Sequence, residues 1–325
     1  MSSLKTKFIG LDLKSPVIAG SCGITTTMES LRKIAEQGAG AVILKSVFEE
    51  QIHQETSYHM EDSYPEEEEY LRHYIRAHAI QKHIDLIKVA KSELDLPIIA
   101  SINCIRDGEW VHFAKELEKA GADALELNIF MLPTDEFVEG TVVENSYFKV
   151  LKHVKSEIKI PIIVKISSAF TNLATFVSKL KAYGANAVTL FNRFYEPDID
   201  IEQMKIQAAS VLSTPADVRT SLRWTGILAG KDRQLEISAS TGVHGGDAVV
   251  KLLLAGATTV QVCSAMYLQG IECIGKMNQF VEEWMTRHEF ETIDEFRRQL
   301  SYAHPEQDEY YERAQFMKYF GDKKI

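Results

Sequence analysis

The chain has 325 residues, a net charge of -10 and 45% hydrophobic residues, which suits one α/β barrel with additional loops. This acidic balance argues against binding to nucleic acid or anionic lipid, because both need a basic surface. No apolar run is long enough for a signal peptide or a membrane span. The cysteines occur singly, without disulfide-framework or zinc-site spacing; they are Cys22, Cys104, Cys263 and Cys273. We therefore expect a cytoplasmic protein with no nucleic-acid, membrane or metal partner.

Eight short apolar runs follow one another along the chain and predict eight strands. The runs lie at about 16–20, 41–45, 97–103, 123–128, 161–166, 186–191, 235–240 and 258–263. Amphipathic stretches separate them, and a further one follows at about 270–288. Four runs come after a Gly-Ala pair, as expected where a helix C-cap leads into a strand; the pairs begin at Gly38, Gly121, Gly184 and Gly256.

The runs are apolar on consecutive positions, which is typical of parallel strands covered by helices on both faces. Eight such βα units in order predict a (β/α)8 TIM barrel within a single domain, 1–325. A doubly wound open sheet is the alternative. We expect the barrel over about 8–290 and a charged, aromatic extension over about 291–325. The polar stretch 49–77 and the long, irregular stretch 194–233 would be loops at the carboxyl ends of the strands, where barrel active sites lie.

Polar residues end the predicted strands and would converge in the mouth of the barrel. They are Gly20, Ser21, Lys45, Ser46, Asn103, Asn128, Lys165, Asn192, Ser240, Thr241 and Ser264. No acidic residue belongs to this set, so a divalent cation would find no hard ligands there. Such a mouth favours an anionic or electron-rich ligand.

Lys165 and Asn128 carry the strongest functional signal among these strand ends. Lys165 lies within the apolar segment IIVKISS, where a charge is costly without a partner. Asn128 lies in the apolar segment ALELNIF, where a polar side chain is likewise costly without a partner. A lysine at a strand end is also often a plain surface group, and we interpret Asn103 and Cys104 as structural.

A glycine-rich segment, TGVHGG, begins at Thr241 and leads directly into a predicted helix. Its free N–H groups and the positive end of the helix would face an anion. The next strand ends at Cys263 and Ser264, whose N–H groups and hydroxyl could close the same pocket. Phosphate sites after the seventh and eighth strands recur in TIM barrels. We therefore predict a phosphate site here, although the glycines alone would also suit plain turns.

Seven segments together carry a resemblance to a known family. They are SPVIAGS at 15–21, GAGAVILKS at 38–46, ELNIF at 126–130, IIVKIS at 162–167, VTLFN at 188–192, STGVHGGDA at 240–248 and GATTVQVCSAM at 256–266. From residue 15 to about 279 the chain resembles the soluble, FMN-dependent class 1 dihydroorotate dehydrogenases. This resemblance implies an FMN-dependent oxidoreductase that acts on a CH–CH group and converts dihydroorotate to orotate in pyrimidine biosynthesis.

The resemblance also implies roles for single residues. The flavin would be lined by Gly20, Ser21, Lys45, Ser46, Asn128 and Lys165, and its phosphate would be held by Thr241, Gly242, Gly245, Cys263 and Ser264. Lys165 would lie near the N1–C2=O edge, where a cation stabilises the charge that collects as hydride reaches N5. We assign Lys165 and Lys45 as catalytic residues, and Asn128 and Asn192 as substrate-binding residues.

Several positions depart from the family pattern on the side of the substrate. Met131 aligns with the cysteine or serine base and cannot accept a proton. Pro133 replaces an asparagine, and Arg193 replaces a small hydroxyl residue. From 47 to 102 the chain contains no asparagine, although the family carries a substrate segment there. The flavin half of the site is therefore kept, and the orotate half is largely rewritten.

Four hypotheses follow for the function. The first is a dihydroorotate dehydrogenase-like flavoenzyme, and the second keeps FMN but acts on a different small molecule read by Arg193 and by loop tyrosines or histidines. The third is a Schiff-base lyase that uses Lys165. The fourth is a flavin-binding scaffold without turnover. We also expect a homodimer, and we leave open an electron-transfer partner such as an iron–sulfur subunit.

Overall fold

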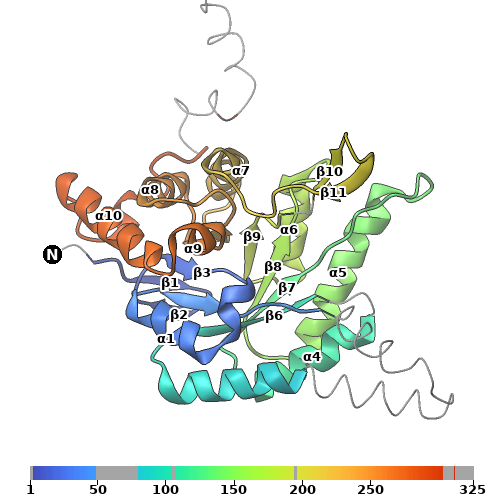
Figure 1. Ribbon diagram of the computed structural model, residues 1–325, viewed down its shortest axis with the longest axis horizontal. Helices are drawn as coiled ribbons and strands as arrows, with labels where there is room; N and C mark the ends of the chain where they lie inside the picture. The colour runs from blue at the N-terminus through green and yellow to red at the C-terminus, as the bar shows by residue number, and fades with distance from the viewer. Residues whose placement is uncertain (1–2, 49–79, 104–106, 194–195, 303–310, 312–325) are drawn as a thin grey trace, which may run out of the picture.

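A closed barrel of parallel strands forms the centre of the molecule (Figure 1). The computed structural model describes residues 3–48, 80–103, 107–193, 196–302 and 311. The barrel strands are β3 (Val17–Ala19), β4 (Ala41–Ile43), β6 (Ile98–Asn103), β7 (Ala124–Asn128), β8 (Ile162–Ile166), β9 (Ala187–Leu190), β12 (Glu236–Ala239) and β13 (Thr259–Val262). They pair in the order β4-β3-β13-β12-β9-β8-β7-β6, and β4 pairs with β6 to close the barrel. Each lies within a predicted run, so the predicted TIM barrel is confirmed and the open sheet is wrong.

Helices cover the outside of this barrel. They are α1 (Met28–Glu36), a helix over 80–93, α4 (Asp107–Lys119), α5 (Gly140–Glu157), α6 (Leu173–Ala182), α7 (Val218–Lys231), α8 (Gly246–Ala255) and α10 (Cys273–Arg287). The residues after α1, α4, α6 and α8 include the predicted capping glycines, whose φ angles are all positive; these are Gly38, Gly121, Gly184 and Gly256. A left-handed residue at this position ends the helix and redirects the chain into the next strand.

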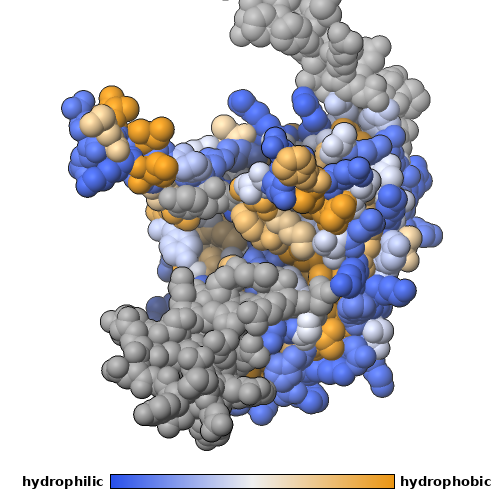
Figure 2. All heavy atoms as spheres, turned by 90° about the vertical axis from the view of Figure 1, so that its right-hand side faces the viewer, coloured by the Kyte–Doolittle hydropathy of each residue, from blue (hydrophilic) through white to orange (hydrophobic). Residues whose placement is uncertain are grey.

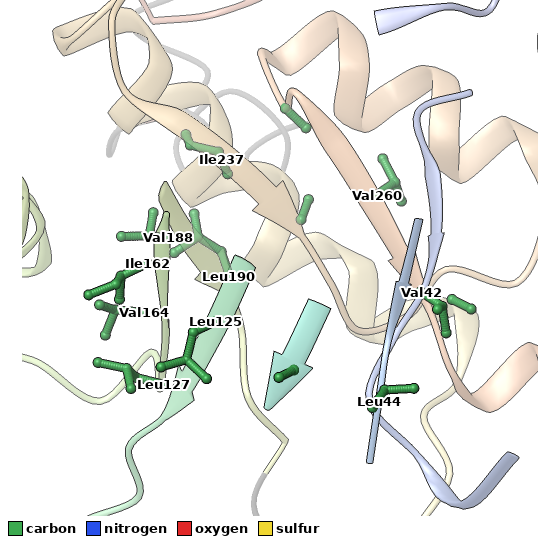
Figure 3. Close-up of a cluster of buried hydrophobic side chains, with 14 of the residues drawn as sticks. Val42, Leu44, Leu125, Leu127, Ile162, Val164, Val188, Leu190, Ile237 and Val260 are labelled. Atoms are coloured by element: carbon green, nitrogen blue, oxygen red, sulfur yellow. The ribbon is translucent and has the colours of Figure 1, made fainter. Parts of the chain in front are cut away.

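Side chains pack on both faces of the barrel strands. The outward-facing ones form the main core with the helices, and Figure 3 shows part of it, including Leu125, Val164 and Val188. The inward-facing ones at the amino ends of the strands form a second cluster, which includes Ile43, Ile99 and Ile163. A hairpin of β1 (Thr6–Phe8) and β2 (Leu11–Leu13) packs Phe8 and Leu13 into this cluster and closes that end of the barrel.

The long stretches outside the barrel have different outcomes. The stretch 49–77 lies outside the described residues. The stretch 194–233 is more regular than we expected: it contains a hairpin of β10 (Pro197–Asp200) and β11 (Lys205–Ala208), the turn η2 (Pro215–Asp217) and helix α7. The strands of the hairpin pair with each other and not with the barrel. Their apolar residues stand singly between polar ones, so no consecutive apolar run marked them. Of the C-terminal extension, α11 (Ile293–Phe296) packs Phe296 into the main core.

The β10–β11 hairpin projects from the barrel (Figure 1), and apolar side chains are exposed on it (Figure 2). Ile199, Met204 and Ile206 are between 63% and 86% exposed. Within the described part of the chain, no helix has both the length and the apolar character needed to cross a membrane. The remaining short elements are β5 (Val47–Phe48), η1 (Gly23–Thr26) and α9 (Ser264–Gln269).

Candidate active site

A cavity of about 550 Å³ lies at the carboxyl ends of the strands, where TIM-barrel active sites form. Eight of the predicted site residues line it: Ser21, Lys165, Asn192, Ser240, Thr241, Gly242, Cys263 and Ser264. A larger hollow of about 770 Å³ lies at the opposite end of the barrel. Most of its charged groups are already paired, for example Lys14 with Asp95 at 2.9 Å. We therefore assign the site to the smaller cavity.

Five of the predicted residues do not line the cavity: Gly20, Lys45, Ser46, Asn128 and Gly245. Ser46 and Asn128 are buried and bond to residues of the lining. Gly20 is buried next to the Cys263 sulfur atom. Lys45 is half-buried, and its carbonyl oxygen accepts a hydrogen bond from the His83 ring at 3.1 Å. Gly245 is the N-cap residue of α8, with an extended φ of -158°.

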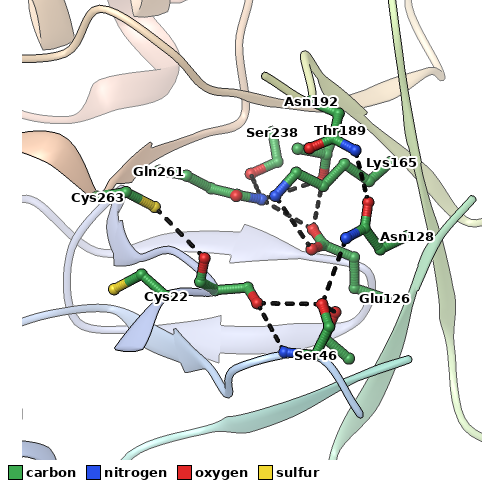
Figure 4. Close-up of polar contacts among 12 residues, drawn as sticks. Cys22, Ser46, Glu126, Asn128, Lys165, Thr189, Asn192, Ser238, Gln261 and Cys263 are labelled. Atoms are coloured by element: carbon green, nitrogen blue, oxygen red, sulfur yellow. Dashed lines mark hydrogen bonds and ion pairs between the residues drawn. The ribbon is translucent and has the colours of Figure 1, made fainter. Parts of the chain in front are cut away.

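A chain of side-chain hydrogen bonds supports the wall of the cavity (Figure 4). The Ser21 and Ser46 hydroxyls lie 3.3 Å apart, and Ser46 and Ser101 lie 2.8 Å apart. The Asn128 amide donates to the Ser46 hydroxyl at 3.4 Å, and the Asn192 amide donates to the Asn128 oxygen at 2.8 Å. The network joins five strands, because Ser101 lies within β6 and each of the other residues ends or follows a different strand. It fixes the two asparagines in one orientation.

Beneath this network the sequence analysis missed a buried carboxylate. Glu126 lies in the middle of β7, fully buried, and its Oε1 atom lies 3.7 Å from the Lys165 Nζ atom. Its Oε2 atom accepts hydrogen bonds from the Thr189 hydroxyl at 2.8 Å and the Gln261 amide at 3.2 Å. The partner that a buried lysine requires is therefore present. The alternation of inward-facing positions pointed to it, since Glu126 and Asn128 lie two residues apart in one strand.

The glycine-rich loop forms a cradle with a second segment that the sequence analysis also missed. Gly242 has a φ of +78°, and a side chain there would lie 2.1 Å from the Val218 nitrogen atom at the start of α7. The Gly242 N–H donates to the Ser213 hydroxyl at 3.3 Å, and the Ser213 N–H donates to the Ser264 hydroxyl at 2.9 Å. Backbone donors and hydroxyls thus gather where α7 and α8 begin. The helix-start sequence Ser-Thr-Pro at 213–215 was the available signal.

The loop after β7 contributes no residue to the lining of the cavity. Met131 is half-buried and packs against the main core. Asp135 is exposed, and its carboxylate accepts a hydrogen bond from the Phe137 N–H at 2.9 Å. The base position of the family therefore presents no proton acceptor to the cavity here.

Arg193 lines the cavity but is bound to the protein's own groups. Its guanidinium lies 3.4 Å from the Asp217 carboxylate and donates to the Ser210 carbonyl oxygen at 2.9 Å. These contacts attach the segment before α7 to the end of β9.

Two thiols also belong to the lining, those of Cys22 and Cys263. The interaction with the Cys263 thiol lowers the pKa of Cys22 to about 7, while the same interaction and burial raise the pKa of Cys263. The Tyr267 hydroxyl also lowers the pKa of Cys22. Across the residues that the structure describes, no group of three or more His, Cys, Asp and Glu side chains is arranged to bind a metal ion.

Comparison of the sequence with known proteins identifies the family of this chain. The sequence model of dihydroorotate dehydrogenase matches residues 3–285. The chain belongs to the dihydroorotate dehydrogenase family. Similar proteins include the catalytic subunits of dihydroorotate dehydrogenase B (NAD(+)) from Thermoplasma volcanium, 26% identical over 91% of this chain and 97% of that one, and from Pyrococcus furiosus, 28% identical over 90% and 97%. Dihydroorotate dehydrogenase A (fumarate) from Limosilactobacillus reuteri is 28% identical over 83% of this chain and 89% of its own.

Proposed function

We propose that the chain binds FMN in this cavity and works as an oxidoreductase of a small anionic molecule. The observation that carries the proposal is one cavity with a backbone cradle at Gly242 and a buried ammonium at Lys165. A cradle of N–H groups beside two helix starts suits a phosphate. A volume of about 550 Å³ falls within the usual range for cofactor sites.

In this proposal the chain binds both the phosphate and the isoalloxazine ring of FMN. The loop at Thr241 and Gly242, with the hydroxyls of Ser213 and Ser264, would hold the phosphate, which would replace the hydrogen bonds that these groups make to one another here. Bound FMN supplies a centre that accepts a hydride and returns two electrons. Lys165 would keep a positive charge beside the ring, which stabilises the reduced, negatively charged form.

The pairing of Lys165 with Glu126 supports the flavin proposal over a Schiff-base lyase. A lyase of that kind needs a free amine as nucleophile. Here the Lys165 Nζ atom lies 3.7 Å from a fully buried carboxylate. The carboxylate instead holds the ammonium in one place, as a fixed electrostatic group requires.

We infer that dihydroorotate, the substrate named for the relatives, is a poor substrate for this chain. A positioned base contributes typically about 10² to 10⁴-fold to such a proton transfer. Met131 cannot supply it, and the loop after β7 contributes no residue to the cavity lining. The best proton acceptor in the lining is the Cys22 thiol, because its pKa is lowered to about 7. Cys22 follows β3, whereas the base of the family follows the strand that corresponds to β7. A different small molecule, placed differently in the cavity, fits these groups better.

We also propose that the electrons leave through a partner protein. Two of the similar proteins are named catalytic subunits, a term that implies another subunit. The exposed apolar side chains of the β10–β11 hairpin offer a surface for protein contact. The expected homodimer stays a prediction, which light scattering on the purified chain tests.

Two measurements test the proposed function. The chromophore released from the purified chain should be FMN, at about one per chain. Anaerobic stopped-flow bleaching should then be at least about 10²-fold slower with dihydroorotate than in a relative that has the base. A colourless protein that does not take up FMN would reject the cofactor. Bleaching as fast as in that relative would reject the inference about the substrate, and a flavin that no reductant in a panel of small acids bleaches would favour a scaffold.

A further inference from the structure

The β10–β11 hairpin is an amphipathic element whose apolar face is exposed. Its register places Ile199 opposite Ile206, and Pro197 opposite Ala208. Successive residues of a strand point to opposite faces, so these four side chains share one face of the hairpin. All four residues are exposed, Ile199 to 63% and Ile206 to 78%.

The charged residues of the two strands lie on the other face. Asp198 lies opposite Gln207, and Asp200 lies opposite Lys205. These positions alternate with the apolar ones, so their side chains point the other way. The apolar face therefore carries no charged side chain from β10 or β11.

The two strands stand out from the barrel and contribute nothing to its core (Figure 1). No other described element makes more than slight contact with them. A two-stranded hairpin on its own is only marginally stable in water. The uncovered apolar face therefore indicates a surface that another protein covers.

The base of the hairpin is fixed to the barrel. The Ala209 N–H donates to the Glu196 carbonyl oxygen at 2.9 Å, which closes the hairpin next to its strands. The Arg193 guanidinium donates to the Ser210 carbonyl oxygen at 2.9 Å and lies 3.4 Å from the Asp217 carboxylate. The hairpin is thus held in place before any contact forms, which lowers the entropic cost of binding.

We propose that a second copy of the chain covers this surface, with the two hairpins packed apolar face to apolar face about a twofold axis. In such a symmetric contact the same residues meet from both sides, so Ile199 and Ile206 of one copy cover those of the other. Sheets packed in this way lie about 10 Å apart, with the side chains of the two inner faces between them.

The distribution of charge favours a second copy over a basic partner. The chain has a net charge of -10, so two copies repel each other overall, and their contact must keep carboxylates apart. Face-to-face packing meets this condition, because Asp198 and Asp200 of both copies point away from the contact. A basic protein would be attracted to that acidic face, which the dimer leaves open to a different partner.

The first test compares two substitutions that add the same charge at neighbouring positions of β11. Ile206→Glu places a carboxylate on the apolar face, and Gln207→Glu places one on the opposite face. Both positions are exposed and lie outside the cavity lining, so both variants should fold. Sedimentation equilibrium of the full chain should give a dimer for the wild type and for Gln207→Glu. For Ile206→Glu it should give the mass of one chain, 36.7 kDa.

Three results would overturn the proposal, with circular dichroism used to show that each variant is folded. They are a wild type that stays monomeric at every protein concentration, an Ile206→Glu variant that remains a dimer, and a Gln207→Glu variant that dissociates equally.

Salt provides a second readout that needs no variant. The wild-type dimer should persist at about 1 M salt, where interactions between charges are screened within about 3 Å. Dissociation at that concentration would show that charges hold the dimer, which contradicts an apolar interface. None of these measurements requires flavin or turnover, so they stand apart from the tests of the proposed function.

Discussion

The two ends of the barrel are built from the same strands but hold opposite kinds of side chain. At the amino ends, inward positions such as Ile43, Ile99 and Ile163 form an apolar cluster that the β1–β2 hairpin closes. Two residues further along β8, the inward position is Lys165, paired with Glu126. The amino end therefore stabilises the fold by burying apolar surface. At the carboxyl end, burial of the charged pair removes it from water, which costs free energy.

This contrast indicates where the chain can change without losing its fold. An apolar end that excludes water keeps the strands in register, so the polar end can vary its loops and its chemistry. The rewritten loop after β7 and the cysteine pair both lie at the polar end. The predictions below test whether stability and ligand chemistry separate along the barrel axis in this way.

The largest effect is expected for Lys165→Ala. It leaves the fully buried Glu126 carboxylate without its cation, and breaking a buried pair in this way costs about 3–5 kcal/mol. Bound FMN should also be reduced on the order of 10²-fold more slowly, because a fixed charge is lost. Urea denaturation measures the first quantity, and stopped-flow bleaching measures the second.

The matched control is the double variant Lys165→Met with Glu126→Gln. It removes both charges, so most of the stability should return while the flavin is still reduced slowly. A double variant as unstable as Lys165→Ala would show that packing, rather than an unpaired charge, causes the loss.

At the opposite end, Leu13→Ala should affect stability alone. Leu13 is 2% exposed within the apolar cluster, and such a truncation costs about 2–5 kcal/mol. The folded fraction should bind FMN as tightly as the wild type, because the hairpin does not line the cavity. Weakened FMN binding by folded protein, measured by fluorescence titration, would show that the two ends are coupled.

A smaller effect on the fold, with a clear effect on the ligand, is expected for Gly242→Ala. The left-handed φ of +78° costs an alanine about 1–2 kcal/mol. The added carbon would also displace the cradle from the start of α7, so FMN should be lost on gel filtration. Gly10→Ala is the control, because Gly10 has a similar left-handed φ of +86°, has open space around it and does not line the cavity. Equal retention of FMN by both variants would argue against the cradle.

The smallest effect is expected for Met131→Cys, which restores a family-type base to the sequence. Because residue 131 packs against the main core and lies outside the cavity lining, the new thiol should leave dihydroorotate bleaching unchanged. A marked acceleration in stopped flow would mean that this loop reaches the substrate, and it would restore dihydroorotate as a good substrate.

The sequence alone predicted the strands and their arrangement, because the signals are local. Each apolar run is buried on both faces and each capping glycine adopts a left-handed φ, so neither feature needs distant contacts to be recognised. The polar residues expected at the strand ends likewise included six that line the cavity, among them Lys165 and Asn192. The strands of the β10–β11 hairpin escaped, since they bury no core side chains and their apolar residues, such as Ile199 and Ile206, stand singly between polar ones instead of in a consecutive run.

Contacts between distant parts of the chain determined the rest. Glu126 and Gln261 are 135 positions apart in sequence, yet they bond at 3.2 Å inside the barrel. Cys22 and Cys263 become neighbours only because the last strand pairs with the first when the barrel closes. Single residues of this kind carry no periodic signal, and the free energy of a buried charge or thiol depends on which groups surround it. The closed barrel supplies those groups, and the order of residues along the chain does not reveal them.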